Sequence, residues 1–262
     1  MLTATFLVIL SVNLAISGGV TQFLISTGVG GGYPDTPTIS PPTTEIIDLV
    51  DEEVSCSNLE DFPVEIFGAV GGNLGSASII CGGSSNDSSS MHESLKQCYK
   101  LLKNGGWEEF TTMISARRFA ASIVRENTLH VFGGWGESST EIIHQDGQIF
   151  QGTYMPMELG SHAIASLNST TSIISGGDYD DYDINDLTWY YNHVTSNFGK
   201  FQSGPPLIVG RMFHSSGTVI DQETKEKIVA VAGGFNEDSG YLDSTELLID
   251  GEWRQGKSIN IN

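Results

Sequence analysis

Basic residues are scarce in this chain of 262 residues, which carries 12 Lys and Arg against 32 Asp and Glu and has a net charge of −20. The first basic residue is Lys96, so the preceding segment holds acidic residues and no Lys or Arg. Such a field repels nucleic-acid backbones and anionic membrane surfaces, because both are negatively charged. The sequence therefore predicts no nucleic-acid partner and favours basic ligands.

Motifs that would supply chemistry are missing as well. The chain contains no Gly-x-Ser-x-Gly elbow, phosphate-binding loop or dinucleotide fingerprint. Its three cysteines form no Cys-x-x-Cys pair and its six histidines are scattered, which argues against a zinc site. We therefore expect no catalytic residues, no metal centre and no cofactor.

The chain is instead marked by an internal repeat of about fifty residues. A short apolar run ends in a Gly pair five times, with steps of 51, 51, 43 and 57 residues. A period of this size, built from β-prone segments and turn residues, is typical of β-propeller blades. The Gly pairs are 31–32, 82–83, 133–134, 176–177 and 233–234.

Each repeat predicts four strands, named here b, c, d and a in chain order. Strand b is the apolar run before the Gly pair, as expected for strands that are buried on both faces. Gly has no side chain and accepts positive φ, so a pair at the strand end lets the backbone turn sharply where blades crowd together. The predicted strands b are 23–25, 77–81, 129–132, 172–175 and 228–232.

Strands c and d carry repeated residues of their own. Strand c begins with Thr-Glu and two aliphatic residues at Thr44, Thr140 and Thr245, whereas 97–99 and 187–190 depart from this pattern. Strand d carries an aromatic residue that fills the gap between adjacent sheets. These aromatic residues are Trp107, Phe150, Phe201 and Trp253.

Strand a is predicted to open the next blade at 117–120, 160–163 and 211–214. His162 and His214 hold the same position in two of these segments. Catalytic groups need not recur with a repeat, so we interpret both histidines as structural.

These features together resemble the kelch-repeat family. The resemblance rests on the Gly doublet, the Glu with its aliphatic pair, the downstream Trp and the Arg followed by His or Ala, and it covers about residues 21 to 254. It implies an all-β, kelch-type β-propeller of about five four-stranded blades. The first blade lacks a strand a in this interpretation, and an unclosed fragment of a six-bladed propeller stays open as an alternative.

The resemblance also bears on function. The Cys-Gly-Gly run and the later Cys-Tyr are similar to the secreted kelch proteins of invertebrates, and no helical adaptor domain precedes the repeats. We expect a non-enzymatic module that binds a protein or glycan ligand. A carbohydrate-active oxidase or hydrolase is the alternative, because propellers host many unrelated activities. The crosslinked Cys and Tyr with two His ligands of kelch-like copper oxidases match no residue set here.

The N-terminus predicts secretion. Residues 1–17 contain a short apolar core followed by small residues, as in a signal peptide cleaved after Ser17, and 18–262 form the propeller domain. The alternative is that this segment is a first strand. The core is too short for a membrane span. In an extracellular chain, Asn86 and Asn168 stand in glycosylation sequons.

A disulfide is predicted between Cys81 and Cys98. Cys81 ends a strand b and Cys98 begins the strand c of the same blade, so antiparallel pairing places them opposite each other. Cys56 is left without a partner in this scheme.

The loops from strand b to strand c predict a binding rim. They share acidic and aromatic residues, and loops on rigid scaffolds commonly carry binding function. For Trp135 and Phe235, capping of the blade core is the alternative. The predicted rim residues are Tyr33, Asp35, Trp135, Glu137, Asp178, Asp180, Asp181, Asp183, Phe235, Glu237 and Asp238.

The fourth of these loops, 178–186, is the densest acidic segment. Its carboxylates at Asp178, Asp180, Asp181 and Asp183 are candidate ligands for Ca²⁺, which takes six to eight oxygens. Their order does not match an EF-hand loop. Since runs of like charge are usually hydrated, a solvated loop is the favoured interpretation.

Overall fold

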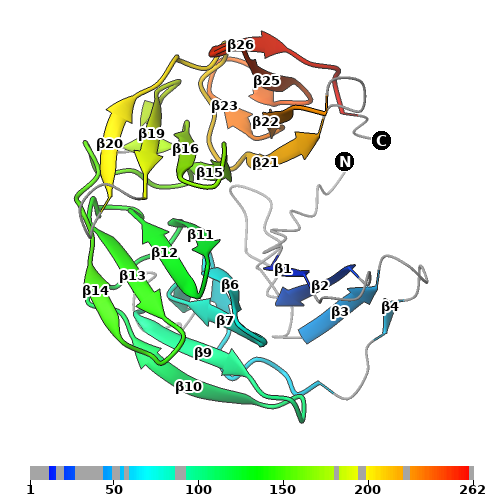
Figure 1. Ribbon diagram of the computed structural model, residues 1–262, viewed down its shortest axis with the longest axis vertical. Coiled ribbons are helices and arrows are strands. Elements are labelled where there is room, and N and C mark those ends of the chain that lie inside the picture. The colour runs from blue at the N-terminus through cyan, green and yellow to red at the C-terminus, as the bar shows by residue number, and fades with distance from the viewer. Residues whose placement is uncertain are drawn as a thin grey trace. The chain divides into compact units, whose positions relative to one another are not determined.

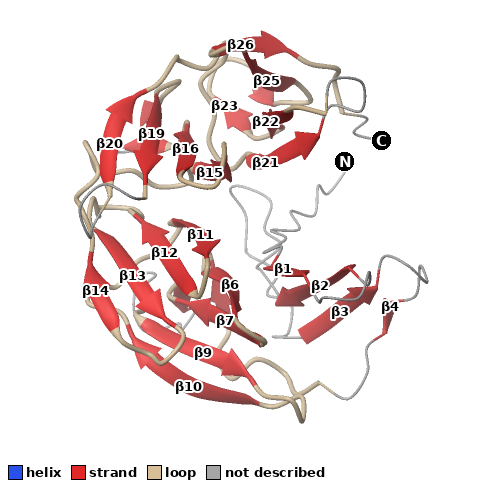
Figure 2. Cartoon of the chain, in the orientation of Figure 1, coloured by secondary structure: helices blue, strands red, loops and turns tan. Residues whose placement is uncertain are grey.

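The computed structural model describes strands 12–15, 21–26, 44–48 and 54–55 and residues 59–85, 93–179, 183–193, 199–220 and 225–259. Within these ranges the chain folds into strands and loops (Figure 2), and no helix there could cross a membrane. Several predicted features lie outside the described residues. They are the Gly pair 31–32, Tyr33, Asp35, Cys56, Asn86, Asp180, Asp181 and the part of the predicted signal peptide outside 12–15.

The strands form five four-stranded sheets (Figure 1), as the repeat predicts. Within each sheet the strands follow the order a, b, c, d. The sheets are β1 (Val12–Ala15), β2 (Thr21–Ser26), β3 (Thr44–Asp48) and β4 (Val54–Ser55); β6 (Val70–Leu74), β7 (Ala77–Cys81), β9 (Gln97–Leu101) and β10 (Trp107–Thr112); β11 (Ala121–Arg125), β12 (Thr128–Phe132), β13 (Thr140–His144) and β14 (Ile149–Gln151); β15 (Ala163–Ser166), β16 (Thr171–Ser175), β19 (Thr188–Asn192) and β20 (Lys200–Ser203); and β21 (Ser215–Ile220), β22 (Lys227–Ala232), β25 (Thr245–Ile249) and β26 (Glu252–Gln255).

Three two-stranded ribbons accompany these sheets. They pair β5 (Ile66–Phe67) with β8 (Ser84–Ser85), β17 (Asp178–Tyr179) with β18 (Asp183–Ile184), and β23 (Phe235–Asn236) with β24 (Gly240–Tyr241). The last two ribbons are built from the loops between strands b and c.

The predicted positions of strand a are wrong by a few residues. The strands begin at Ala121, Ala163 and Ser215, so two predicted segments end before their strands and the third, 160–163, reaches its strand only at its last residue. The reason is local backbone geometry, because Phe119, Ser161 and Phe213 each have a φ of 53°. A left-handed residue cannot belong to an extended strand, so the strand starts beyond it.

The first sheet also corrects an expectation. It is complete, because β1 pairs antiparallel with β2 from Val12 opposite Leu24 to Ala15 opposite Thr21. The predicted absence of a strand a from the first blade is therefore wrong. Strand β1 lies inside the predicted signal peptide, so cleavage after Ser17 would remove it. The cleavage itself stays a prediction.

The Gly pairs join consecutive sheets. The N–H of the second Gly donates to the carbonyl of the residue four positions before the next strand a, as from Gly83 to Arg117 at 2.9 Å and from Gly134 to Leu159 at 2.9 Å. The first Gly has no room for a side chain. A Cβ at Gly133, where φ is +59°, would lie 2.7 Å from the Leu159 carbonyl oxygen. The Gly pairs therefore recur in the sequence because each one forms this close contact between consecutive sheets.

The chain divides into two compact units. The first comprises residues 1–118, 124–130 and 141–150, and the second comprises 119–123, 131–140 and 151–262. Each has its own apolar core. In the second unit, one core cluster contains Ala165, Ile173, Leu207, Val229, Val231, Leu248 and Trp253. The aromatic residue predicted for strand d is thus a core residue at Trp253.

Candidate functional site

The second unit presents the loops that the sequence predicts as a binding rim. Strands a, b, c and d alternate in direction. The b-to-c loop and the connection that leads into strand a therefore lie at the same end of the strands in a sheet. We call this end of the sheets the b–c edge. In the second unit it comprises the b-to-c loops 133–139, 176–187 and 233–244 and the connections 152–162 and 204–214.

A buried ion pair anchors one of these connections. Arg211 Nη2 donates to Glu246 Oε1 at 2.7 Å, and both side chains are excluded from solvent. The same carboxylate accepts the backbone N–H groups of Ile208 at 2.7 Å and Val209 at 3.1 Å. The Thr-Glu pattern of strand c therefore holds the chain that leads into strand a.

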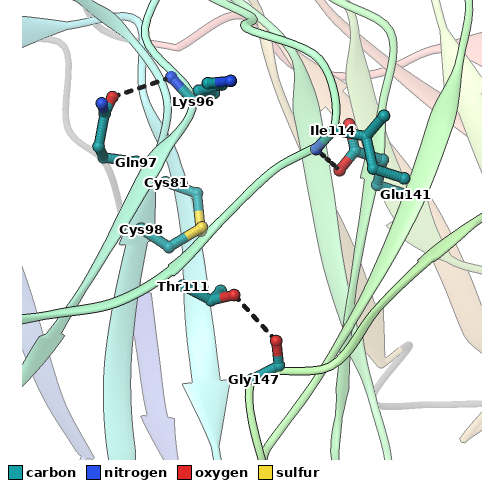
Figure 3. Close-up of a disulfide and its surroundings, with 8 residues drawn as sticks. All are labelled: Cys81, Lys96, Gln97, Cys98, Thr111, Ile114, Glu141 and Gly147. Carbon is teal, nitrogen blue, oxygen red and sulfur yellow. Dashed lines mark hydrogen bonds between the residues drawn. A yellow bond between two sulfur atoms is a disulfide. The ribbon is translucent and has the colours of Figure 1, made fainter.

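The first unit repeats this arrangement. Arg117 Nη2 lies 2.6 Å from Glu141 Oε1, and that carboxylate accepts the N–H groups of Ile114 at 2.8 Å and Ser115 at 2.9 Å. Figure 3 shows the bond from Ile114 to Glu141. The sequence pattern contains both the Arg and the Glu, but their pairing was not predicted.

Apolar residues occupy the same two positions in another sheet. Trp189 pairs with Ile174 as Glu246 pairs with Val231, and Leu159 precedes its strand a as Arg211 does. Leu159 and Trp189 pack in one buried cluster. An apolar pair can replace a buried ion pair without loss, because no charge then has to leave water.

Three aromatic rings, Phe119, Trp135 and Phe213, form a cluster, which we call the aromatic cluster. The ring centroids of Phe119 lie 4.7 Å from Trp135 and 5.3 Å from Phe213. Trp135 donates its indole N–H to Asp178 Oδ1 at 3.2 Å and to Ser161 Oγ at 3.3 Å. Asp178 is 4% exposed, whereas Phe213 is 48% exposed. The rings therefore form a fixed platform with an accessible side.

Backbone geometry holds the platform. Phe119, Ser161 and Phe213 share the left-handed conformation and are linked in series, since Ser161 N–H donates to Phe119 O at 2.8 Å and Phe213 N–H donates to Ser161 O at 2.9 Å. Gly160 leaves space for the indole, because a Cβ at this position would overlap Trp135. Such strained residues persist only where their surroundings hold them in place.

A depression of about 550 Å³ lies beside the ribbon of β17 and β18. Its lining comes from both loops and connections of the b–c edge. The lining residues are Met157, Tyr179, Asp183, Ile184, Asn185, Asp186, Leu187, Gly210 and Asn236. The sequence analysis lists only Asp183 among them as a binding residue. Tyr179, Ile184, Asn185 and Asp186 belong to the same predicted acidic loop, and the fold brings Met157, Gly210 and Asn236 beside it.

The remaining predicted rim residues of the second unit are dispersed. Phe235 is half-buried and packs against Tyr241 with ring centroids 5.4 Å apart. Glu137 accepts the Ser139 N–H at 2.7 Å, which shapes its own loop. Glu237 and Asp238 are exposed at the turn of the ribbon of β23 and β24.

The candidate Ca²⁺ ligands within the described residues lie in different environments. Asp178 is buried against Trp135, whereas Asp183 is exposed at the depression. No group of three or more His, Cys, Asp or Glu residues that could hold a metal occurs in the described part of the chain.

The two recurrent histidines are enclosed in the second unit. Burial lowers the pKa of His162 to about 4, and burial with the nearby Arg211 charge lowers the pKa of His214 to about 3. His214 Nε2 lies 3.0 Å from Ser175 Oγ. Neutral, buried imidazoles of this kind fit the structural role that the repeat predicts.

The predicted disulfide is present in the first unit. Cys81 and Cys98 are bonded, with 4.0 Å between their Cα atoms, and they bridge directly opposed positions of β7 and β9 (Figure 3). In the second unit, Asn168 is exposed at a turn, where its Oδ1 accepts the N–H groups of Thr170 and Thr171, both at 2.9 Å.

The comparison with solved structures identifies the architecture. The chain is similar to the structure of YjhT, a kelch-repeat propeller, with a TM-score of 0.76 over 98% of this chain and 85% of that chain. The fold is that of a kelch β-propeller. The kelch resemblance of the Gly pairs is thereby confirmed at the level of the fold.

The likeness does not extend to the sequence. The two chains are 12% identical, so the comparison shows the kelch propeller fold alone. No protein-family model and no curated protein matches this sequence.

Proposed function

We propose that this kelch propeller is a secreted, non-enzymatic module that binds a basic protein through the b–c edge of its second unit. The observation that carries the proposal is the concentration of exposed apolar side chains at this edge. Five of them are between 43% and 61% exposed. They are Tyr154, Leu187, Ile208, Phe213 and Tyr241. Exposed apolar side chains that gather in one region mark interaction surfaces more often than scattered ones.

The charge of the edge favours a basic partner. Exposed acids lie on the same loops and connections as the apolar residues. They are Glu158, Asp183, Asp186, Glu237, Asp238 and Asp243. Complementary charge speeds association and suppresses wrong partners. The net charge of −20 adds a long-range field of the same sign.

The aromatic cluster supports a binding role for a second reason. Trp135 is held by Asp178 and Ser161, so little side-chain entropy is lost when a partner covers the platform. Trp and Tyr are enriched among the residues that dominate binding energy. A rigid aromatic anchor within an acidic edge is therefore suited to a partner that carries both apolar and cationic groups.

Secretion is supported by two features of the described residues. The disulfide between Cys81 and Cys98 belongs to an oxidising compartment, and Asn168 is accessible to a glycosyltransferase. The enzymatic alternative predicts turnover of a glycan, which oxidase and hydrolase assays on the purified protein would detect.

Retention on immobilised polylysine across a salt series tests the proposal. The edge variant D183N/D186N/E237Q/D238N removes four charges from the b–c edge. The control E126Q/D146N/D250N/E252Q removes four exposed charges from three turns at the opposite sheet ends and from the first residue of β26. We expect the edge variant to elute at clearly lower salt than the control, since exposed charges act within about 8 Å at physiological ionic strength. Equal elution of the two variants, or salt-independent retention, would contradict the proposal.

The variant Phe213→Ser tests the apolar part of the b–c edge. The repeat itself places Ser161 at this position, so the backbone accepts the change. Val219→Ser is the matched control, because Val219 is 47% exposed but lies away from the b–c edge on β21. Captured partner protein, once identified, should bind Phe213→Ser more weakly than Val219→Ser.

A further inference from the structure

We infer that the depression beside β17 and β18 receives an arginine side chain of the protein partner. This inference rests on the proposed function and names the chemistry of one contact within it. Met157, Ile184 and Leu187 contribute apolar side chains to the lining, Tyr179 contributes an aromatic ring, and Asp183 and Asp186 contribute two carboxylates. The volume of about 550 Å³ accommodates the side chain with its flanking backbone.

The two amides in the lining are already engaged. Asn185 donates to Gly177 O at 3.0 Å and accepts the Leu187 N–H at 3.0 Å. Asn236 donates to Gly210 O at 2.8 Å and accepts the Asp238 N–H at 3.0 Å. These amides shape the walls, so the carboxylates are the charged groups that the depression offers to a ligand.

The mixture of walls and charges selects an organic cation over a metal ion. Ca²⁺ requires six to eight oxygen ligands, whereas most of the lining side chains here are apolar or engaged. A ligand with an apolar stem and a cationic head fits both parts. Among protein side chains, Lys and Arg have this form.

Arginine fits better than lysine for two reasons. Its guanidinium is less strongly hydrated and stacks on aromatic rings, and Tyr179 supplies such a ring in the lining. Its planar fork also pairs with carboxylates through two parallel bonds, which a lysine ammonium cannot do. Asp183 and Asp186, both exposed, can turn toward such a group.

The depression and the aromatic cluster are joined through one ribbon. Asp178, which holds the Trp135 indole, is followed by Tyr179, which lines the depression, and β17 pairs with β18 at Asp183. A partner can therefore place an apolar group on the aromatic cluster and an arginine in the depression. This places both contacts within one interface of the second unit.

The test is an NMR titration of the isotope-labelled protein with the peptide acetyl-Gly-Arg-Gly-amide. The matched peptides carry citrulline, which keeps the shape and removes the charge, or lysine. We expect the arginine peptide to shift the amide resonances of 183–187 and to bind about tenfold more tightly than the citrulline peptide, since a charge pair is lost with citrulline. Binding of the citrulline peptide with equal affinity would overturn the inference.

Protein variants distinguish binding in the depression from a general effect of the acidic residues on the b–c edge. D183N/D186N is expected to weaken the arginine peptide about tenfold, whereas E237Q/D238N, which removes the same charge from the neighbouring ribbon, changes the affinity less than about twofold. Thermal unfolding of both variants checks that exposed substitutions leave the fold intact. Equal weakening by the two variants refutes the arginine site while leaving the basic-partner proposal standing. Failure of polylysine retention refutes that proposal instead.

A further arm distinguishes a protein partner from a small metabolite. Arginine amide lacks the flanking backbone, so we expect it to bind more weakly than the tripeptide. Tighter binding of arginine amide would overturn the assignment to a protein partner.

Discussion

Trp189 occupies in strand β19 the position that Glu246 occupies in strand β25. Each residue lies opposite the second residue before a Gly pair, Ile174 in one case and Val231 in the other. The residue that contacts this position changes as well, since Leu159 holds the position before β15 that Arg211 holds before β21. The kelch propeller thus connects its sheets with either a buried ion pair or a buried apolar pair.

The ion pair leads to the first prediction. Glu246→Ala leaves the Arg211 guanidinium buried without its carboxylate, so we expect the free energy of unfolding to fall by about 3–5 kcal/mol. The double variant Arg211→Leu/Glu246→Trp copies the apolar pair and is expected to cost less than the two single changes added together. Urea unfolding of the original protein, Arg211→Leu, Glu246→Trp and the double variant measures this cycle.

The exposed pair of Arg254 and Asp250 supplies the control. Their side chains are 52% and 77% exposed, and Arg254→Ala should change stability by no more than about 1 kcal/mol. A Glu246→Ala variant as stable as Arg254→Ala would show that the buried pair does not hold the connection.

The second prediction concerns the joint between sheets. Gly133→Ala places a methyl group 2.7 Å from the Leu159 carbonyl at a φ of +59°. Left-handed strain and overpacking together should lower the free energy of unfolding by about 3 kcal/mol. Gly217→Ala is the control, because nothing lies within 4 Å of its Cβ and its φ is not left-handed. Similar stability of the two variants would argue against a steric role for the Gly pairs.

The third prediction is a loss of stability in acid. The folded pKa values of His162 and His214, about 4 and about 3, lie below the ordinary value of 6.5, so the fold favours the neutral form. The stabilisation is complete above pH 6.5, decreases as the pH falls below 6.5, and is fully lost once the pH is below the folded pKa values. For His162 the loss between pH 7 and pH 5 is about 2 kcal/mol.

Urea midpoints measured over this range test the third prediction. His162→Ala uses the residue that the chain carries at the equivalent Ala120, and it should flatten the dependence on pH while lowering stability at pH 7. A slope that is the same in His162→Ala and in the original protein would refute the assignment.

The fourth prediction concerns the disulfide. Cys81 and Cys98 close a loop with a sequence separation of 17, and removing the bond by Cys81→Ser/Cys98→Ser should cost about 3 kcal/mol. Peptide mapping without reduction should recover the two cysteines in one linked fragment. Added reductant should destabilise the original protein and leave the double variant unaffected. Separate fragments in the map would show that the bond does not form.

Strands b, c and d could be predicted because their signals are local. An apolar run that stops at Gly, or an aromatic residue repeated at a fixed spacing, describes the surroundings of a strand whatever its partners are. Strand a was misplaced since a left-handed turn at Phe119, Ser161 and Phe213 leaves little trace in residue type. The segment of strand β1 was assigned to a signal peptide, with a first strand as the alternative, because a short apolar run fits both.

The sequence by itself determined the kelch propeller and the disulfide, since the Gly pairs recur at spacings that the strands impose and the two cysteines fall on neighbouring strands of one repeat. Only the tertiary structure decided which residues meet across the repeats. The indole of Trp135 reaches Asp178, 43 residues away, and the depression gathers side chains from two loops and two connections. Such contacts depend on how whole sheets pack, and burial between sheets leaves no periodic pattern in the chain.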